Sequence, residues 1–344
     1  MVAALPLDTL RRLPKVLLHE HLDGGLRPAT LLHLLRARGL PAPAADAAGL
    51  AAWFAARAHA GSLPEYLKGF GLTVAAMAEP AAMEQVAFEA AETARAEGCV
   101  LAEFRMAPLL LESDTVSAEA ATEALLAGLA RSALPCGLIL CAMRHEPAER
   151  SERVAQLAQR YRGQGVVGLD LAGAEAGHPP GDHASALALA RDAGLPITLH
   201  AGEADAAERV LEAAALGARR IGHGVRLGDW LATAEGRARL DAVRALGLHL
   251  ELCPSSNVHT GAVPSLAAHP LAALWRAGIS LSYHTDNPLM SCTSMSAEAA
   301  LLMTHQGLTP ADLGAMAVQA AEHSFLPDAV RLPALASLRA HAWA

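Results

Sequence analysis

Histidines and an aspartate at separate places in the chain have the types and spacing of a metal-dependent catalytic site. His19 and His21 end an apolar run with one residue between them. An extended backbone points residues i and i+2 toward the same side. His200 and Asp286 end or follow two later apolar runs. A lone histidine is more often a hydrogen-bonded structural residue, but three imidazoles and one carboxylate together form a zinc ligand set that leaves room for water.

Two further polar residues occupy similar positions in the sequence. Glu203 stands three residues after His200, and His223 lies between two glycines at the end of another apolar run. Because an acid and a base beside a metal can catalyse hydrolysis, we predict that Glu203 and His223 are catalytic. Two-metal hydrolases usually carry a bridging carboxylate, often a modified lysine. Here the corresponding run ends in Asp170 without lysine, which favours a single ion.

The elements that position these residues follow a regular alternation. Short apolar runs rich in strand-forming residues alternate with Ala/Leu/Glu/Arg-rich stretches of helical spacing. The predicted strands are 16–21, 99–106, 137–143, 166–171, 196–200, 219–222, 248–253 and 279–284. Such alternation implies parallel pairing, and eight units close into an α/β (β/α)8 TIM barrel with its active site at the strand carboxyl ends.

The barrel is predicted to occupy residues 1–344 as a single domain with two additions. Segment 26–98 is longer than one crossover helix needs, so we expect extra helices inserted after the first strand. This insertion would cover the barrel mouth as a lid. Residues 296–344 are predicted to form closing helices.

Composition excludes several other classes of protein. The chain is 53% hydrophobic, yet its uninterrupted apolar runs fall short of the ~20 residues that span a bilayer. The first residues lack the features of a signal peptide, so we expect a cytoplasmic location. Five cysteines without a C-x-x-C pair indicate reduced thiols. A net charge of -8 and 3% aromatic residues disfavour nucleic acid and favour a small-molecule partner. Nothing indicates the oligomeric state.

Ordered motifs along nearly the whole chain resemble the adenosine deaminase family. They cover residues 14–24, 141–145, 170–173, 200–203, 221–224, 251–254, 285–286 and 324–327. The resemblance implies zinc-dependent conversion of adenosine and 2′-deoxyadenosine to inosine products and ammonia in purine salvage. It assigns one Zn2+ per chain to His19, His21, His200 and Asp286.

The resemblance also implies roles around the substrate. Glu203 would protonate purine N1 as water attacks C6, and His223 would orient and deprotonate that water. The Gly173 N–H would lie near purine N3, where the lack of a side chain permits close approach. Asp23 would accept a hydrogen bond from the ribose 5′-hydroxyl, or would merely form a turn with the glycines that follow it. His21 would also border the nucleoside.

Some positions depart from the family pattern or have two interpretations. Asn287 stands where the family commonly has a second aspartate facing purine N7, and its amide can still donate to that atom. His284 stands where asparagine is frequent, and we expect it to support the metal site or line the barrel. Tyr66, Leu67 and Phe70 match a segment that flanks the ribose, but they equally suit helix packing.

Two alternative functions stay open at this level. The first is a deaminase of another 6-aminopurine, such as free adenine or a 5′-substituted adenosine like aminodeoxyfutalosine. Asp23 favours a nucleoside over free base, since adenine-specific relatives tend to carry glutamate there. The second is a silent zinc-stabilised barrel that binds a nucleoside. Glu203 and His223 argue against it, because a binder needs no acid and base beside the metal.

Overall fold

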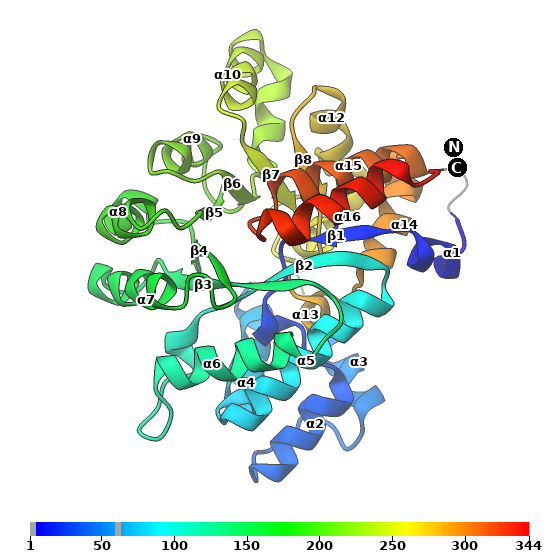
Figure 1. Cartoon of the computed structure of the whole chain (residues 1–344). Coiled ribbons are helices and arrows are strands. Elements are labelled where there is room, and N and C mark those ends of the chain that lie inside the picture. The colour runs from blue at the N-terminus through cyan, green and yellow to red at the C-terminus, as the bar shows by residue number, and fades with distance from the viewer. Residues whose placement is uncertain (1–4, 59–62, 344) are drawn as a thin grey trace.

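Eight parallel strands lie at the centre of the molecule, as the computed structural model shows for residues 5–58 and 63–343 (Figure 1). The strands are β1 (Lys15–Leu17), β2 (Cys99–Met106), β3 (Cys136–Met143), β4 (Val166–Ala172), β5 (Thr198–Ala201), β6 (Arg220–His223), β7 (His249–Leu252) and β8 (Leu281–Tyr283). They form two four-stranded ladders, β1 to β4 and β5 to β8. Parallel bridges between Leu169 and Ile197 and between Glu20 and Asp286 join the ladders. The predicted (β/α)8 barrel is confirmed.

The first strand is shorter than the sequence predicts. We expected strand over 16–21, whereas β1 ends at Leu17. The Leu18 N–H donates to His284 Nδ1 over 3.2 Å, and the Leu18 carbonyl accepts from the Arg105 guanidinium over 2.7 Å. Because side chains take these hydrogen bonds, the backbone ladder stops here. The two histidines of the H-x-H motif therefore lie just beyond β1, in a segment tied to β8 and β2 by isolated bridges.

The inside of the barrel is polar. Alternate strand residues point to one face, and in many TIM barrels the inner face is filled by branched aliphatic side chains. Here several buried alternate residues are polar and are hydrogen-bonded or paired with neighbouring side chains, namely Glu103 and Arg105 on β2, Thr198 and His200 on β5, Arg220 on β6, His249 and Glu251 on β7, Ser282 on β8, and His284 directly after β8. Buried polar groups need partners, so this interior fixes side-chain orientations below the site.

The described residues of segment 26–98 form four helices, α2 (Pro28–Ala37), α3 (Ala47–Ala58), α4 (Leu63–Met77) and α5 (Pro80–Ala96). Figure 1 shows α2, α3 and α4 gathered on one side of the barrel. There α4 packs on η1 (Leu22–Gly24) and α3 packs on α13 (Pro288–Ser291). The helices therefore border the loops that follow β1 and β8, and a lid role stays a prediction. Phe70 is partly buried against the core, and the side chains of Tyr66 and Leu67 lie outside the described residues.

The remaining helices surround the strands. They are α1 (Leu7–Arg12), α6 (Ala118–Ala130), α7 (Ala148–Arg160), α8 (Ala184–Asp192), α9 (Glu208–Ala215), α10 (Ala234–Ala245), α11 (Pro254–His259), α12 (Leu271–Arg276), α14 (Met295–Gln306), α15 (Pro310–His323) and α16 (Asp328–Ala340). Helices α15 and α16 cover the outer faces of β1 and β2, where Val16 and Leu101 join an apolar cluster with Leu338. None of the helices in the described ranges is long and apolar enough to cross a membrane.

Candidate active site

Four predicted metal ligands converge at the carboxyl end of the barrel. His19 Nε2 lies 3.2 Å and His21 Nε2 lies 3.5 Å from Asp286 Oδ1. His21 Nε2 and His200 Nε2 are 3.3 Å apart. His223 joins the same cluster, with ligand atoms of His19, His200, His223 and Asp286 all within 4.8 Å of one another. The structure therefore brings together residues from the ends of β1, β5, β6 and β8, and the cluster suits a divalent metal ion.

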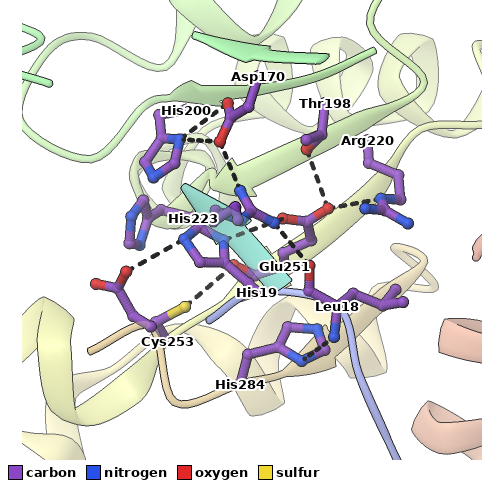
Figure 2. A network of polar contacts seen from close by, with 12 residues as sticks. Leu18, His19, Asp170, Thr198, His200, Arg220, His223, Glu251, Cys253 and His284 are labelled. Carbon is purple, nitrogen blue, oxygen red and sulfur yellow. Dashed lines mark hydrogen bonds and ion pairs between the residues drawn. The ribbon is translucent and has the colours of Figure 1, made fainter. Parts of the chain in front are cut away.

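Two buried carboxylates turn the imidazoles toward this cluster. Glu251 Oε2 lies 3.0 Å from His19 Nδ1, and Asp170 Oδ2 lies 3.0 Å from His200 Nδ1 (Figure 2). A carboxylate on Nδ1 fixes the tautomer and leaves the Nε2 lone pair free for a metal. His19 Nε2 is indeed buried without a hydrogen-bond partner, although Asp286 Oδ1 is near. His19 Nε2 and Asp286 Oδ1 are both electron-rich and face each other at 3.2 Å, an arrangement that a cation between them would stabilise. The residues present therefore fit a metal ion.

A single arginine links the two carboxylates. Arg105 donates to Asp170 Oδ2 over 2.8 Å and to Glu251 Oε2 over 2.6 Å. Glu251 Oε1 also accepts from Arg220 Nε and Thr198 Oγ1. Burial by itself would raise the pKa of Glu251, but the charges of Arg105 and Arg220 hold that pKa well below its usual range. The supports of two imidazoles are therefore joined in one charged network inside the barrel.

Backbone strain coincides with the site. His223 and Asp286 have φ angles of 64° and 58°, in the left-handed region that residues with a Cβ rarely adopt. Such a residue costs about 1–3 kcal/mol and persists where its surroundings hold it in place. The Ser256 hydroxyl helps at Asp286 by donating to Oδ2 over 2.6 Å. The strained backbone at His223 and Asp286 therefore lowers the stability of the fold but orients these two side chains.

The predicted acid and base lie beside the cluster and share one neighbour. Glu203 Oε2 is 3.6 Å from His223 Nε2. Asn257 Nδ2 lies 3.1 Å from both Glu203 Oε1 and His223 Nδ1, and Thr260 Oγ1 donates to Glu203 Oε1 over 2.9 Å. Our sequence reasoning missed Asn257 and Thr260. Their one signal is their place shortly after β7, in the short helix α11 (Asn257) and at its carboxyl end (Thr260).

The backbone of the acid is held by another residue that our sequence reasoning missed. Glu175, in the loop after β4, accepts hydrogen bonds from four successive backbone N–H groups at 202–205, with distances of 2.5 to 3.1 Å. The Arg226 Nε group also donates to the Glu203 carbonyl over 3.0 Å. Glu175 itself is buried. The loop that carries Glu203 is therefore tied to the loop after β4.

The residues expected at the substrate lie around the same strand ends. Asp23 is buried, its Oδ1 has no hydrogen-bond partner, and burial raises its pKa to about 7. Asn287 Oδ1 is likewise buried without a partner. The Asn287 side chain presses against Gly24, where an added Cβ would come within 2.0 Å of Asn287 Oδ1. Gly173 follows β4 with φ 93°, a conformation that favours glycine.

His284 does not join the cluster. Its ring is fully buried, its Nδ1 accepts from the Leu18 N–H, and its Nε2 lies 2.7 Å from Ser282 Oγ. Figure 2 shows the contact with Leu18, which joins the residue after β8 to the segment after β1. His284 therefore has the contacts of a barrel-lining residue.

A closed parallel barrel with a cluster of histidines and aspartate at its carboxyl end is typical of metal-dependent hydrolases. The adenosine deaminase family model matches residues 14–340. The adenosine deaminase of Mycobacterium tuberculosis is 43% identical to this chain, over 99% of this chain and 100% of its own length. The chain belongs to the adenosine deaminase family, which confirms the resemblance seen in its motifs.

Solved structures of related enzymes have the same fold. The apo N6-methyl-AMP deaminase of Arabidopsis thaliana is 27% identical, covers 98% of this chain and 99% of its own, and has a TM-score of 0.84. An adenine deaminase from Arthrobacter aurescens is 25% identical, covers 95% of this chain and 98% of its own, and has a TM-score of 0.81. Similar barrels therefore serve more than one 6-aminopurine.

Proposed function

We propose that this protein is an adenosine deaminase that hydrolyses adenosine and 2′-deoxyadenosine to the inosine products and ammonia. The observation that carries the proposal is that His19 and His21 lie 3.2 and 3.5 Å from Asp286, and His21 lies 3.3 Å from His200, in a cluster that His223 joins beside Glu203. The 43% identity to a named adenosine deaminase over the full chain supports it.

The metal would be held by His19, His21, His200 and Asp286, with one zinc ion per chain. When bound, such an ion supplies a Lewis acid that makes water nucleophilic near neutral pH. His19 and His200 are suited to bind the ion, because a carboxylate occupies Nδ1 of each ring and Nε2 is directed into the cluster. Asp286 contributes Oδ1, which lies 3.2 Å from His19 Nε2.

The remaining steps fall to the acid and the base. Glu203 would hand a proton to purine N1, which removes the aromatic resistance to attack at C6. His223 lies within the same cluster of side chains and would orient the attacking water. The hydroxyl proton of the tetrahedral adduct then passes to the 6-amino group, which leaves as ammonia while the C6 carbonyl of inosine forms, and the other water proton replaces the one that Glu203 gave to N1. Asn257 and Thr260 keep the Glu203 carboxyl in place for this transfer.

Three residues would recognise the nucleoside. Asp23 is proposed to bind the ribose 5′-hydroxyl, Gly173 to approach purine N3 through its N–H, and Asn287 to contact N7. The unpartnered buried Oδ1 atom of Asp23 supports the first of these roles, because buried polar atoms normally have partners and this one can accept from a hydroxyl. An acidic group at the 5′ position also disfavours a nucleotide, whose phosphate would meet it with like charge.

A panel of purines tests this proposal. The zinc-loaded protein is assayed with adenosine, 2′-deoxyadenosine, adenine, AMP and a 5′-substituted adenosine, following the loss of absorbance near the adenosine band. We expect both nucleosides to have the highest kcat/KM, and adenine to fall by about 100-fold or more because the ribose contacts are lost. A higher kcat/KM for adenine or AMP, or no reaction with any purine, would contradict the proposal.

A further inference from the structure

Asn257 occupies a position that no catalytic role above explains in full. It lies in α11, is fully buried, and contacts both the acid and the base. Its Nδ2 is 3.1 Å from Glu203 Oε1 and 3.1 Å from His223 Nδ1. On the other side, its Oδ1 is 3.1 Å from His269 Nε2. One amide thus connects three groups whose donor and acceptor roles depend on each other.

The direction of these hydrogen bonds follows from one backbone group. The Leu271 N–H is an obligatory donor, and it points at His269 Nδ1 over 3.1 Å. His269 Nδ1 must therefore accept, which leaves the ring proton on Nε2. Burial lowers the pKa of His269 to about 3, so the ring is neutral and has this single N–H. That N–H donates to Asn257 Oδ1, and the amide can have only one orientation.

The other side of the amide is then determined as well. With Oδ1 bound to His269, both hydrogens of Asn257 Nδ2 face the site. One donates to the Glu203 carboxyl and the other to His223 Nδ1. A neutral His223 ring that accepts at Nδ1 carries its proton on Nε2. That atom is the one that lies 3.6 Å from Glu203 Oε2.

His269 is itself held in place by close packing. The residue is 3% exposed and precedes Pro270, which caps α12. Pro270 lies against Gly228, where an added Cβ would come within 2.5 Å of Pro270 Cβ. Gly228 belongs to η4 (Val225–Ala232), which directly follows His223 at the end of β6. The residue that orients the amide is therefore fixed to the same loop as the base.

We propose that Asn257, kept in one orientation by His269, is a positioning residue that aligns Glu203 and fixes the proton of neutral His223 on Nε2. His223 then directs its Nε2–H group toward the reacting atoms. It therefore orients the attacking water by donating a hydrogen bond and does not remove a proton from that water. This inference rests on the proposed function for its kinetic consequence, but the tautomer of His223 does not depend on it.

The tautomer can be measured directly. In the metal-loaded protein with nitrogen-15 histidine, the neutral His223 ring is expected to carry its hydrogen on Nε2 and to show an unprotonated Nδ1. Asn257→Ala is expected to remove this preference. A His223 ring that is protonated on Nδ1 in the wild-type protein overturns the proposal, whatever substrate the enzyme uses.

Two substitutions at position 269 give the kinetic test. His269→Leu removes the donor to Asn257, and we expect kcat to fall about 10-fold with KM and metal content unchanged. His269→Gln keeps an N–H at the place of Nε2, and we expect kcat within about threefold of the wild type. Equal activity of the Leu variant and the wild type, or equal loss in both variants, overturns the proposal.

Thr260→Val provides a matched control. This change removes the second donor to Glu203 Oε1 and leaves the contact between Asn257 and His223 in place. It is expected to lower kcat without altering the His223 tautomer. A wild-type protein that deaminates no purine would contradict the proposed function alone, since the nitrogen-15 measurement would still decide the position of the proton.

Discussion

The two halves of the active site are held by different kinds of chemistry. The metal-binding half is supported from inside the barrel by charges, with Arg105 between Asp170 and Glu251. Glu203 and His223 are supported from the segment between β7 and α12 by neutral groups, chiefly Asn257, Thr260 and His269. The proposed metal ligands lie at strand ends above a charged interior, whereas Glu203 and His223 contact a network with defined donors and acceptors. Substitutions in one half should therefore change metal binding, and substitutions in the other half should change kcat.

The largest effect is expected where the charged support is broken. Arg105→Met leaves Asp170 and Glu251 buried without their shared partner, which costs about 3–5 kcal/mol of unfolding free energy. The imidazoles that these carboxylates orient should also bind metal more weakly. Urea denaturation and metal analysis of the purified protein measure both effects.

Arg131→Met is the control for the loss of an arginine. Its ion pair with Glu84 is half exposed, so its removal should change stability by less than about 1 kcal/mol. If Arg105→Met retained its full metal content and the stability of this control, the charged network would not support the metal-binding half.

The helix that carries Asn257 is expected to have a pH-dependent contact with Glu298. Glu298 is buried in α14 beside the start of α11, where it accepts from Thr293 Oγ1 over 2.6 Å. Burial raises its pKa from 4.5 to about 7. The unfolded chain loses this proton as pH rises past 4.5, whereas the folded protein keeps it until about 7. The stabilising contribution is therefore complete at low pH and disappears as pH rises toward 7.

Glu298→Gln removes this titration. Relative to the wild type, the variant should gain up to about 3 kcal/mol of stability between pH 4.5 and pH 8. Denaturation curves of the two proteins across this range provide the measurement. A stability difference that is constant with pH would show that Glu298 is not held neutral.

The smallest effect concerns the loop that carries the acid. In Glu175→Gln the amide presents hydrogens to the backbone N–H groups at 202–205, so we expect a loss of about 1–3 kcal/mol and a lower kcat with unchanged metal content. Glu97→Gln is the matched control, because Glu97 binds the backbone N–H of Ser296 near the amino end of β2. It should lose stability without losing kcat. Parallel changes in the two variants would mean that Glu175 has no specific effect on the acid.

Much of this architecture could be read from the sequence. The alternation of apolar runs and helical stretches predicts all eight strands, because each strand is continuous in sequence. The H-x-H motif, His200 and Asp286 could be found because barrel sites gather at strand carboxyl ends. The early end of β1 could not be predicted, because the side chains of Arg105 and His284 replace the backbone hydrogen-bond partners of Leu18.

The residues that hold Glu203 and His223 in place were also hard to predict, because they are distant in sequence from the residues they contact. Asn257 acts on Glu203 across 54 residues of sequence, and Glu175 acts on the same loop through backbone groups that leave no pattern in residue types. Polar residues alternating within apolar strands, such as Glu103 and Arg105, were the signal that could have predicted the charged interior.

Metal content and turnover of Glu203→Gln, measured on the same sample, test most directly whether the two halves are separate. Glu203 is not among the predicted ligands, so the variant should keep one metal ion per chain. Its kcat for adenosine should fall by about 100- to 10,000-fold, because the proton for N1 is lost. Retained turnover, or loss of the metal together with the activity, would contradict the account.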